Sequence, residues 1–241
     1  MNYEVFIEGE NITLCIPNEY AITNDGWASW FNETERLNAT GHGVFPNFRE
    51  SQRERLISLA IDDANISLLV CNLSAEQAFG IVSLQNIDFR ARSCDIAFNL
   101  NAAARKGLPE LAALEVMALA SEHGFNYLGV DRIFAGQVAD VLANWNKRCE
   151  VVGYQTEGVL RRAFRKGHRV SDVFQNVMHH EVFLKLSAHR GGQLWPGNEE
   201  VKRLLSLQPK ISAAQKLDEA LHEIEMTAYS YLYDAIEEKN V

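Results

Sequence analysis

The chain has 241 residues, of which 47 % are hydrophobic and 23 % charged, a composition typical of a globular protein with a sizeable core. Lys and Arg total 23 against 32 Asp and Glu, which gives a net charge of −9. Because proteins that bind a phosphate backbone need clustered cations, we expect no nucleic-acid partner. A local basic site for one small anionic ligand is still allowed.

The cysteines and the first residues indicate the compartment. Cys15, Cys71, Cys94 and Cys149 are scattered and form no CxxC pair, so we expect neither a metal site nor a disulfide framework. Reduced thiols are typical of the cytoplasm. The first residues carry acids where a signal peptide has basic residues, and no run of about 18 apolar residues exists. We therefore expect a cytoplasmic protein that does not contact a membrane.

The first hundred residues predict strands separated by short helices. Residues 5–16 alternate imperfectly and predict a strand, whereas Trp27, Trp30 and Phe31 recur at roughly helical spacing within 18–38. Residues 40–47 form a breaker-rich loop, and a helical pattern follows over 49–63. Three consecutive strands are then predicted at 66–71, 78–85 and 94–100.

The clearest helix is predicted over 108–123, where Leu111, Leu114 and Met117 recur at three-residue steps and Gly124 follows as a C-cap. A short strand at 131–135, a helix at 138–152 and two strands at 158–165 and 173–186 complete the pattern. Helices that flank a meander of consecutive strands predict an α+β fold with a mixed, mostly antiparallel central sheet.

A change in composition at 189–197 separates residues 1–188, the predicted domain, from a helical C-terminal extension over 189–241. The extension predicts helices at 199–207 and 211–238. In the second helix, apolar residues from Ile211 to Ile236 form a stripe at three- and four-residue steps. This stripe either packs on the chain's own body or forms a face for a partner, such as a homodimer.

One segment has the physical features of a pyrophosphate site. The predicted strand from Cys94 to Leu100 is followed by Arg105 and Lys106, and then by Gly107 at the start of a helix. A helix start offers unpaired N–H groups and the positive end of the macrodipole, and a glycine lets backbone approach a ligand. The alternative is a solvated helix start with two surface cations.

A second signal follows later in the chain, where a helix ends at Gly153-Tyr154 and Glu157-Gly158 leads through Val159 and Leu160 to Arg161. Together with Asp95-Ile96-Ala97-Phe98 and Arg105-Lys106-Gly107-Leu108-Pro109, this order resembles the GCN5-related N-acetyltransferase superfamily over residues 8–186. The match is closest to the branch of ribosomal-protein and amino-sugar-nucleotide N-acetyltransferases. Four positions depart from that pattern, namely Ala104, Pro109, Leu142 and Cys149.

The resemblance implies acetyl transfer from acetyl-CoA to an amine by direct attack. It assigns coenzyme A to the strand end and the helix start, namely Phe98, Asn99, Leu100, Arg105, Lys106, Gly107, Leu108, Pro109 and Glu110. Backbone N–H groups near Phe98 would polarise the thioester carbonyl.

The same chemistry needs a base for the ammonium proton and a proton donor for the thiolate. Asp95 lies where an acid often lies in this branch, and the alternative for it is an exposed or ion-paired strand acid. His42 is in the loop that this fold places over the acceptor, and the alternative is a merely exposed loop residue. Cys149 is a candidate proton donor, although a cysteine on an apolar helix face also suits core packing. No metal site is expected.

The aromatic residues Trp27, Trp30, Phe31 and Phe45 cluster in the segment that lines the acceptor site in this superfamily. They either stack on a sugar or base or close the core. We expect an N-acetyltransferase that acts on a small amine, an amino sugar or its nucleotide-linked form. The alternatives are a protein N-terminal acetyltransferase and a catalytically degenerate acyl-CoA-binding protein.

Overall fold

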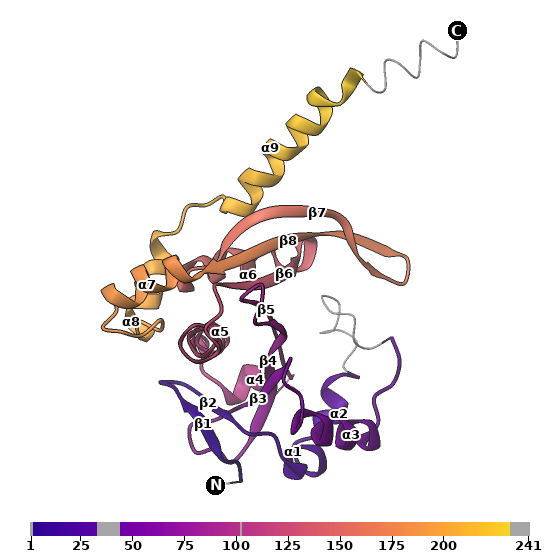
Figure 1. The fold of residues 1–241 in the computed structure, drawn as a ribbon, viewed down its shortest axis with the longest axis vertical. Coiled ribbons are helices and arrows are strands. Elements are labelled where there is room, and N and C mark those ends of the chain that lie inside the picture. The colour runs from indigo at the N-terminus through magenta and orange to yellow at the C-terminus, as the bar shows by residue number, and fades with distance from the viewer. Residues whose placement is uncertain (1, 33–43, 102, 232–241) are drawn as a thin grey trace.

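The computed structural model describes residues 2–32, 44–101 and 103–231, and within them one eight-stranded sheet has the order β1-β2-β3-β4-β5-β6-β8-β7 (Figure 1). Neighbouring strands are antiparallel except β5 and β6, which are parallel. The expected α+β fold with a mostly antiparallel sheet is confirmed. The strands are β1 (Val5–Glu8), β2 (Thr13–Cys15), β3 (Ile66–Cys71), β4 (Ala78–Asp88), β5 (Ser93–Leu100), β6 (Arg132–Val138), β7 (Gln155–Lys166) and β8 (Arg169–His179).

Helices flank this sheet and extend beyond it. They are α1 (Glu19–Thr23), α2 (Trp27–Trp30), α3 (Arg49–Leu59), α4 (Ala104–Gly107), α5 (Ala112–His123), α6 (Ala139–Cys149), α7 (His180–His189), α8 (Asn198–Leu207) and α9 (Ala213–Ala228). A π-helical turn at Gly124–Leu128 follows α5, and a 3₁₀ turn at Glu150–Val152 follows α6. No helix in the described part of the chain is long and apolar enough to cross a membrane.

The two faces of the sheet differ in what covers them. Because side chains alternate along a strand, Leu68 and Val82 pack on one face with α5, in the main core. Leu69 and Ile81 point the opposite way and pack with Trp27 of α2. We call these the α5 face and the α2 face. Residues that are partners in neighbouring strands point to the same face, so the α5 face and the α2 face continue across β5, β6 and β8.

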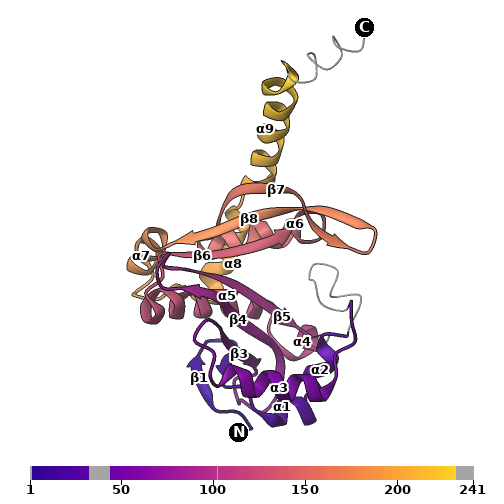
Figure 2. The ribbon, with the colours of Figure 1, turned by 45° about the vertical axis from the view of Figure 1, so that its right-hand side comes forward.

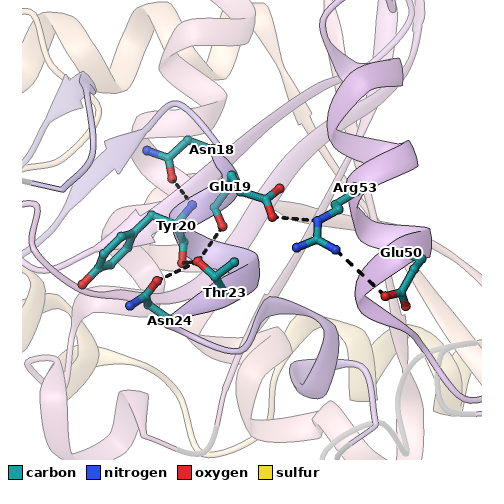
Figure 3. A network of polar contacts seen from close by, with 7 residues as sticks. All are labelled: Asn18, Glu19, Tyr20, Thr23, Asn24, Glu50 and Arg53. Atoms are coloured by element: carbon teal, nitrogen blue, oxygen red, sulfur yellow. Dashed lines mark hydrogen bonds and ion pairs between the residues drawn. The ribbon is translucent and has the colours of Figure 1, made fainter.

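Polar contacts fix α1 and tie it to α3 (Figure 3). The Asn18 side chain accepts a hydrogen bond from the Tyr20 N–H at 3.0 Å and so caps α1. Glu19 pairs with Arg53 of α3 at 2.7 Å, and Glu50 lies 3.9 Å from the same guanidinium. These exposed pairs each contribute on the order of 0–1 kcal/mol, so burial of Trp27 and Ile22 holds the α1–α3 layer.

Several predicted elements differ in extent. The strand predicted over 5–16 is a hairpin of two strands, and the helix predicted from residue 108 begins at Ala112. The strand predicted over 173–186 ends at His179, after which α7 begins. The run Val182-Phe183-Leu184 is apolar enough for either structure, and periodicity does not separate short buried strands from helices.

Residues 190–207 pack against the main core. Leu194 and Val201 are fully buried, and the Trp195 indole N–H donates to Glu10 at 2.8 Å. By contrast, α9 projects away from the sheet in both views (Figures 1 and 2). Even so, α9 contacts β7, where Arg161 pairs with Asp218 at 2.5 Å and with Glu225 at 3.2 Å.

Candidate functional site

The parallel strands β5 and β6 separate partway along their length. In the described chain their ladder joins Ser93, Cys94 and Asp95 to Arg132–Phe134, whereas β5 stays paired with β4 as far as Leu100. The Asn101 N–H donates to Phe79 of β4 at 2.7 Å. Because hydrogen-bonding direction alternates along a strand, the N–H and C=O of Phe98 point toward β6, into the opening. We call this opening the splayed gap.

Side chains from both sides reach the splayed gap. The Phe98 ring meets the Trp145 ring of α6 edge-to-face, with centroids 5.4 Å apart, on the α5 face. Asn99 lies on the α2 face, opposite Ile81. Its buried Nδ2 has no hydrogen-bond partner among the described residues.

The segment before α5 contains a separate short helix, which the sequence does not predict. Gly107 ends the short helix α4, and an irregular stretch from Leu108 to Leu111 precedes α5. The Ala112 and Leu114 amides already donate to Pro109 and Leu111 carbonyls, at 3.1 and 3.0 Å. In the described chain the amides of Glu110, Leu111 and Ala113 donate to no carbonyl, so they remain for a ligand.

Gly107 has a structural role beside the cofactor-binding role predicted for it, because it packs against a ring. A Cβ added there would lie 2.1 and 2.4 Å from the Phe79 ring carbons. Phe79 is itself buried. The glycine therefore allows α4 to pack on β4.

Cations border the start of α5. Lys106 is exposed, and Arg148 of α6 lies 3.7 Å from Glu110. The side chain of Arg105 lies outside the described residues. The sequence pattern does not indicate Arg148, because only the packing of α6 brings this residue to the start of α5. The predicted residues Leu108 and Pro109 are half-buried and exposed respectively, and they offer carbon surface only.

Asp95 is the last β5 residue in register with β6, so its side chain lies where the splayed gap begins. It shares the α2 face with Phe134, its partner in β6. Its Oδ2 accepts a hydrogen bond from Asn86 Nδ2 at 2.7 Å, and the residue is half-buried. His42, the second predicted candidate, lies outside the described residues.

Cys149 belongs to the core, contrary to the role considered for it. It has no exposed surface, and Gln137 Nε2 donates to its Sγ at 3.4 Å. Burial raises the pKa of this thiol to about 12. A fully buried thiol cannot contact an incoming substrate, so the alternative interpretation, core packing, describes it.

Three of the four predicted acceptor-site aromatics also close the core. Trp27, Trp30 and Phe31 are 0 %, 2 % and 4 % exposed and pack with β3 and β4. The prediction that these three rings bind an acceptor is therefore wrong, because the core covers their faces. Phe45 is 80 % exposed and stays available.

The α2 face carries a polar cluster whose members lie far apart in the sequence. Glu157 of β7 accepts from Arg132 of β6 at 2.7 Å and lies 2.5 Å from His179 Nε2 of β8. Arg132 also lies 5.0 Å above the Phe134 ring. Glu157 was part of the quoted motif, but its partners depend on the register of three strands, which no local pattern reveals.

A cavity of about 700 Å³ opens elsewhere, between the β1–β2 turn, α5 and the segment before α8. Two acidic side chains that line this cavity form hydrogen bonds with backbone amides of the protein. The buried Glu115 accepts from the backbone amides of Glu10 and Asn11, and Glu122 accepts from the Leu194 amide. These carboxylates secure two chain segments to α5, and we therefore place the candidate site at the splayed gap.

No family model and no curated protein matches the sequence. The structure is similar to that of spermidine N-acetyltransferase from Vibrio cholerae, solved with CoA and spermine. The TM-score is 0.62 at 16 % identity, over 72 % of this chain and 98 % of that chain. It is also similar to the microcin C7 self-immunity acetyltransferase MccE, solved with acetyl-CoA and AMP. Here the TM-score is 0.59 at 17 % identity, over 71 % and 93 % of the two chains. The chain therefore shares the fold of these acetyltransferases.

Proposed function

We propose that this protein is an acetyl-CoA-dependent N-acetyltransferase of the GCN5-related superfamily that acts on a small amine. The splayed gap carries the proposal, since it exposes the backbone of Phe98 between two strands that the fold elsewhere keeps paired. The shared fold with two acetyltransferases supports it. The finer branch of ribosomal-protein and amino-sugar enzymes is part of the proposal.

The residues at the gap suit coenzyme A. The amides of Glu110, Leu111 and Ala113, with Lys106 and Arg148 nearby, offer donors and positive charge to a pyrophosphate. The Phe98 N–H offers a donor to a carbonyl oxygen. Bound acetyl-CoA would supply an activated acetyl group.

Asp95 is the base that the geometry favours for the acceptor ammonium. It lies at the start of the gap on the α2 face, beside the half-buried Phe134 and Gln175 and the exposed Gly136 of β6 and β8. A carboxylate there holds the ammonium and accepts its proton, directly or through water, before the amine attacks. Asn86 fixes the orientation of this carboxylate.

We propose an amino sugar or a nucleotide-linked amino sugar as the acceptor. MccE, which was solved with AMP, supports a nucleotide-bearing ligand on this fold. The test measures release of free thiol from acetyl-CoA with glucosamine, UDP-glucosamine, spermidine and an N-terminal peptide. We expect turnover with an amino sugar. Turnover with the peptide alone would reassign the chain as a protein N-terminal acetyltransferase.

A second candidate function is acyl-CoA binding without catalysis. The burial of Cys149 favours it, because one of the candidate groups for proton transfer cannot reach a substrate. A ligand at 100 times its dissociation constant adds about 2.7 kcal/mol to the free energy of unfolding. Stabilisation of that order by acetyl-CoA without turnover on any amine would favour this candidate.

We further propose that residues 189–241 act as an extension that supports a homodimer, and that the protein works in the cytoplasm. Along α9, Ala214 is buried and Leu221 half-buried, whereas Ile224, and Tyr229 directly after the helix, are each 50 % exposed. The outer half of α9 therefore presents an apolar face that a second copy could cover.

A further inference from the structure

Arg132 of β6 lies between two carboxylates on the α2 face and pairs with one of them. Its Nη2 donates to Glu157 of β7 at 2.7 Å. Asp95 of β5 lies on the other side of β6, because the strand order is β5-β6-β8-β7. Within the described chain no basic side chain forms an ion pair with Asp95. The partner that Arg132 takes therefore decides whether Asp95 stays free.

Arg132 is close enough to Asp95 to pair with it. Asp95 is in register with Phe134, so Arg132 is displaced from Asp95 by one strand and two residues on the same face. With strands about 4.8 Å apart and a rise of about 3.3 Å per residue, the two Cα atoms lie roughly 8 Å apart. Long side chains bridge such diagonal positions. The Arg132 guanidinium already extends toward this level, since it lies 5.0 Å from the centroid of the Phe134 ring.

An ion pair between Arg132 and Asp95 would disable the proposed base. A guanidinium beside a carboxylate stabilises the charged form and so weakens the carboxylate as a proton acceptor. An arginine without an acidic partner at this position would also repel the ammonium group of an acceptor. Glu157 prevents both effects, because it neutralises Arg132 and holds the guanidinium on the side of β6 that is away from Asp95.

A β-bulge and a histidine fix the position of Glu157. The register of β7 with β8 shifts between Thr156 and Gly158, and Glu157 is the extra residue of the bulge. Bulges redirect side chains and recur beside active sites. While Oε2 of Glu157 accepts from Arg132, Oε1 lies 2.5 Å from Nε2 of His179. Both carboxylate oxygens are therefore engaged, which holds the group in one orientation.

Arg132 keeps the capacity to bind another carboxylate. Its side chain is 41 % exposed, and its buried Nε has no hydrogen-bond partner among the described residues. An ion pair this exposed adds little to the free energy of unfolding, because water screens the two charges. The pair between Arg132 and Glu157 therefore matters for where it holds the guanidinium.

We infer that Glu157 is a positioning residue, which binds Arg132 and so keeps the Asp95 carboxylate free for the acceptor amine. This inference rests on the proposed function, in which Asp95 is the base. His179 supports Glu157 in this role through its contact with the second carboxylate oxygen.

Removal of Glu157, followed by removal of the arginine charge, tests the inference by kinetics. The amine is the one that the wild type acetylates best among glucosamine, UDP-glucosamine, spermidine and an N-terminal peptide. In Glu157→Ala we expect kcat/KM for this amine to fall at least about tenfold, as part of the roughly 10²–10⁴-fold contribution of a general base. The KM for acetyl-CoA should not change. Arg132→Met keeps a long side chain without the charge, so the double variant Glu157→Ala/Arg132→Met should regain the wild-type kcat/KM.

The rescue separates this role from a merely structural one. If Glu157 only stabilised the sheet, removal of Arg132 as well would not restore activity. A double variant that stays impaired, or a Glu157→Ala enzyme as active as the wild type, would overturn the inference. The matched control is Glu200→Ala, which breaks an exposed pair with Arg203 at 2.6 Å on α8 and should keep wild-type kinetics.

A crystal structure of Glu157→Ala tests the inference without turnover. We expect the Arg132 guanidinium to lie within about 4 Å of the Asp95 carboxylate, the usual limit of an ion pair. A guanidinium that stays farther away would overturn the inference, and acetylation by the wild type would then still support the proposed enzyme. An Arg132–Asp95 pair in the variant, without acetylation of any amine by the wild type, would remove the proposed catalysis and keep the restraint of Arg132 by Glu157.

Discussion

Asp95 is half-buried, and the side-chain amide of Asn86 orients its carboxylate. Replacement of Asp95 by Asn keeps the size and the hydrogen-bonding reach of the side chain but removes the base. We expect kcat/KM for acetyl transfer to fall about 10²–10⁴-fold, the usual contribution of a general base. Thiol release at saturating acetyl-CoA measures it.

The control for Asp95 is Asp63→Asn, an exposed acid away from the gap, which should leave kcat/KM unchanged. The binding of CoA should also persist in the Asp95 variant, because the cofactor contacts lie at the start of α5. Full activity in Asp95→Asn would show that another group accepts the proton.

The packing of Gly107 on Phe79 predicts a stability defect. An alanine Cβ at Gly107 would collide with the buried ring, so Gly107→Ala should lower the free energy of unfolding by about 1–3 kcal/mol. Gly158→Ala is the matched control, since nothing lies within 4 Å of its added Cβ. Urea unfolding measures both variants. Equal free energies of unfolding for the two variants would mean that Gly107 does not pack against the Phe79 ring.

Glu115 predicts a pH dependence. Burial raises the pKa of this carboxyl above its usual value, even though two backbone amides donate to it. The folded state then holds its proton at a pH where the unfolded state has released it. The contribution of Glu115 to stability is therefore fully present below about 4.3, its unfolded pKa, and declines as the pH rises through the raised value.

The measurement for Glu115 compares the wild type with Glu115→Gln by urea unfolding at pH 4 and pH 7. The variant lacks this titration, so the stability advantage of the wild type should be larger at pH 4. The amide also presents a donor to one of the two N–H groups that Glu115 accepts, which costs about 1–3 kcal/mol. An advantage that grows toward pH 7 would contradict the raised pKa.

Among the elements, α9 carries the prediction about assembly. If a second copy covers its outer face, Ile224→Glu places a charge in that contact and should shift the particle from dimer to monomer. His222→Glu adds the same charge about 160° around the helix and should leave the dimer intact. Light scattering after size exclusion measures the mass, and a wild-type monomer would remove the proposed homodimer.

Element types were largely predictable from the sequence, and element boundaries less so. The three-residue steps of Leu111, Leu114 and Met117 predicted α5, but not that Gly107 ends a separate helix. That break depends on the Phe79 ring, a contact distant in sequence. Likewise, the sequence around Val182 and Phe183 is compatible with a strand or a helix, and only tertiary packing determines that it forms α7.

The candidate site was predictable only where its residues are close together in the sequence. The segment from Asp95 to Glu110 was found because strand, loop and helix start adjoin one another in the sequence. The contact of Glu157 with His179 and Arg132 was not found, since it needs the pairing of β6, β7 and β8. The burial of Trp27 and Cys149 also depends on which face each helix turns inward.

For the whole molecule, the central claim is that coenzyme A occupies the splayed gap between β5 and β6. Hydrogen–deuterium exchange of the full chain, with and without CoA, tests it most directly. We expect slower exchange at residues 96–100 and 110–114, and no change at 190–200 beside the acidic cavity. Protection at 190–200 with none at 96–100 would contradict it.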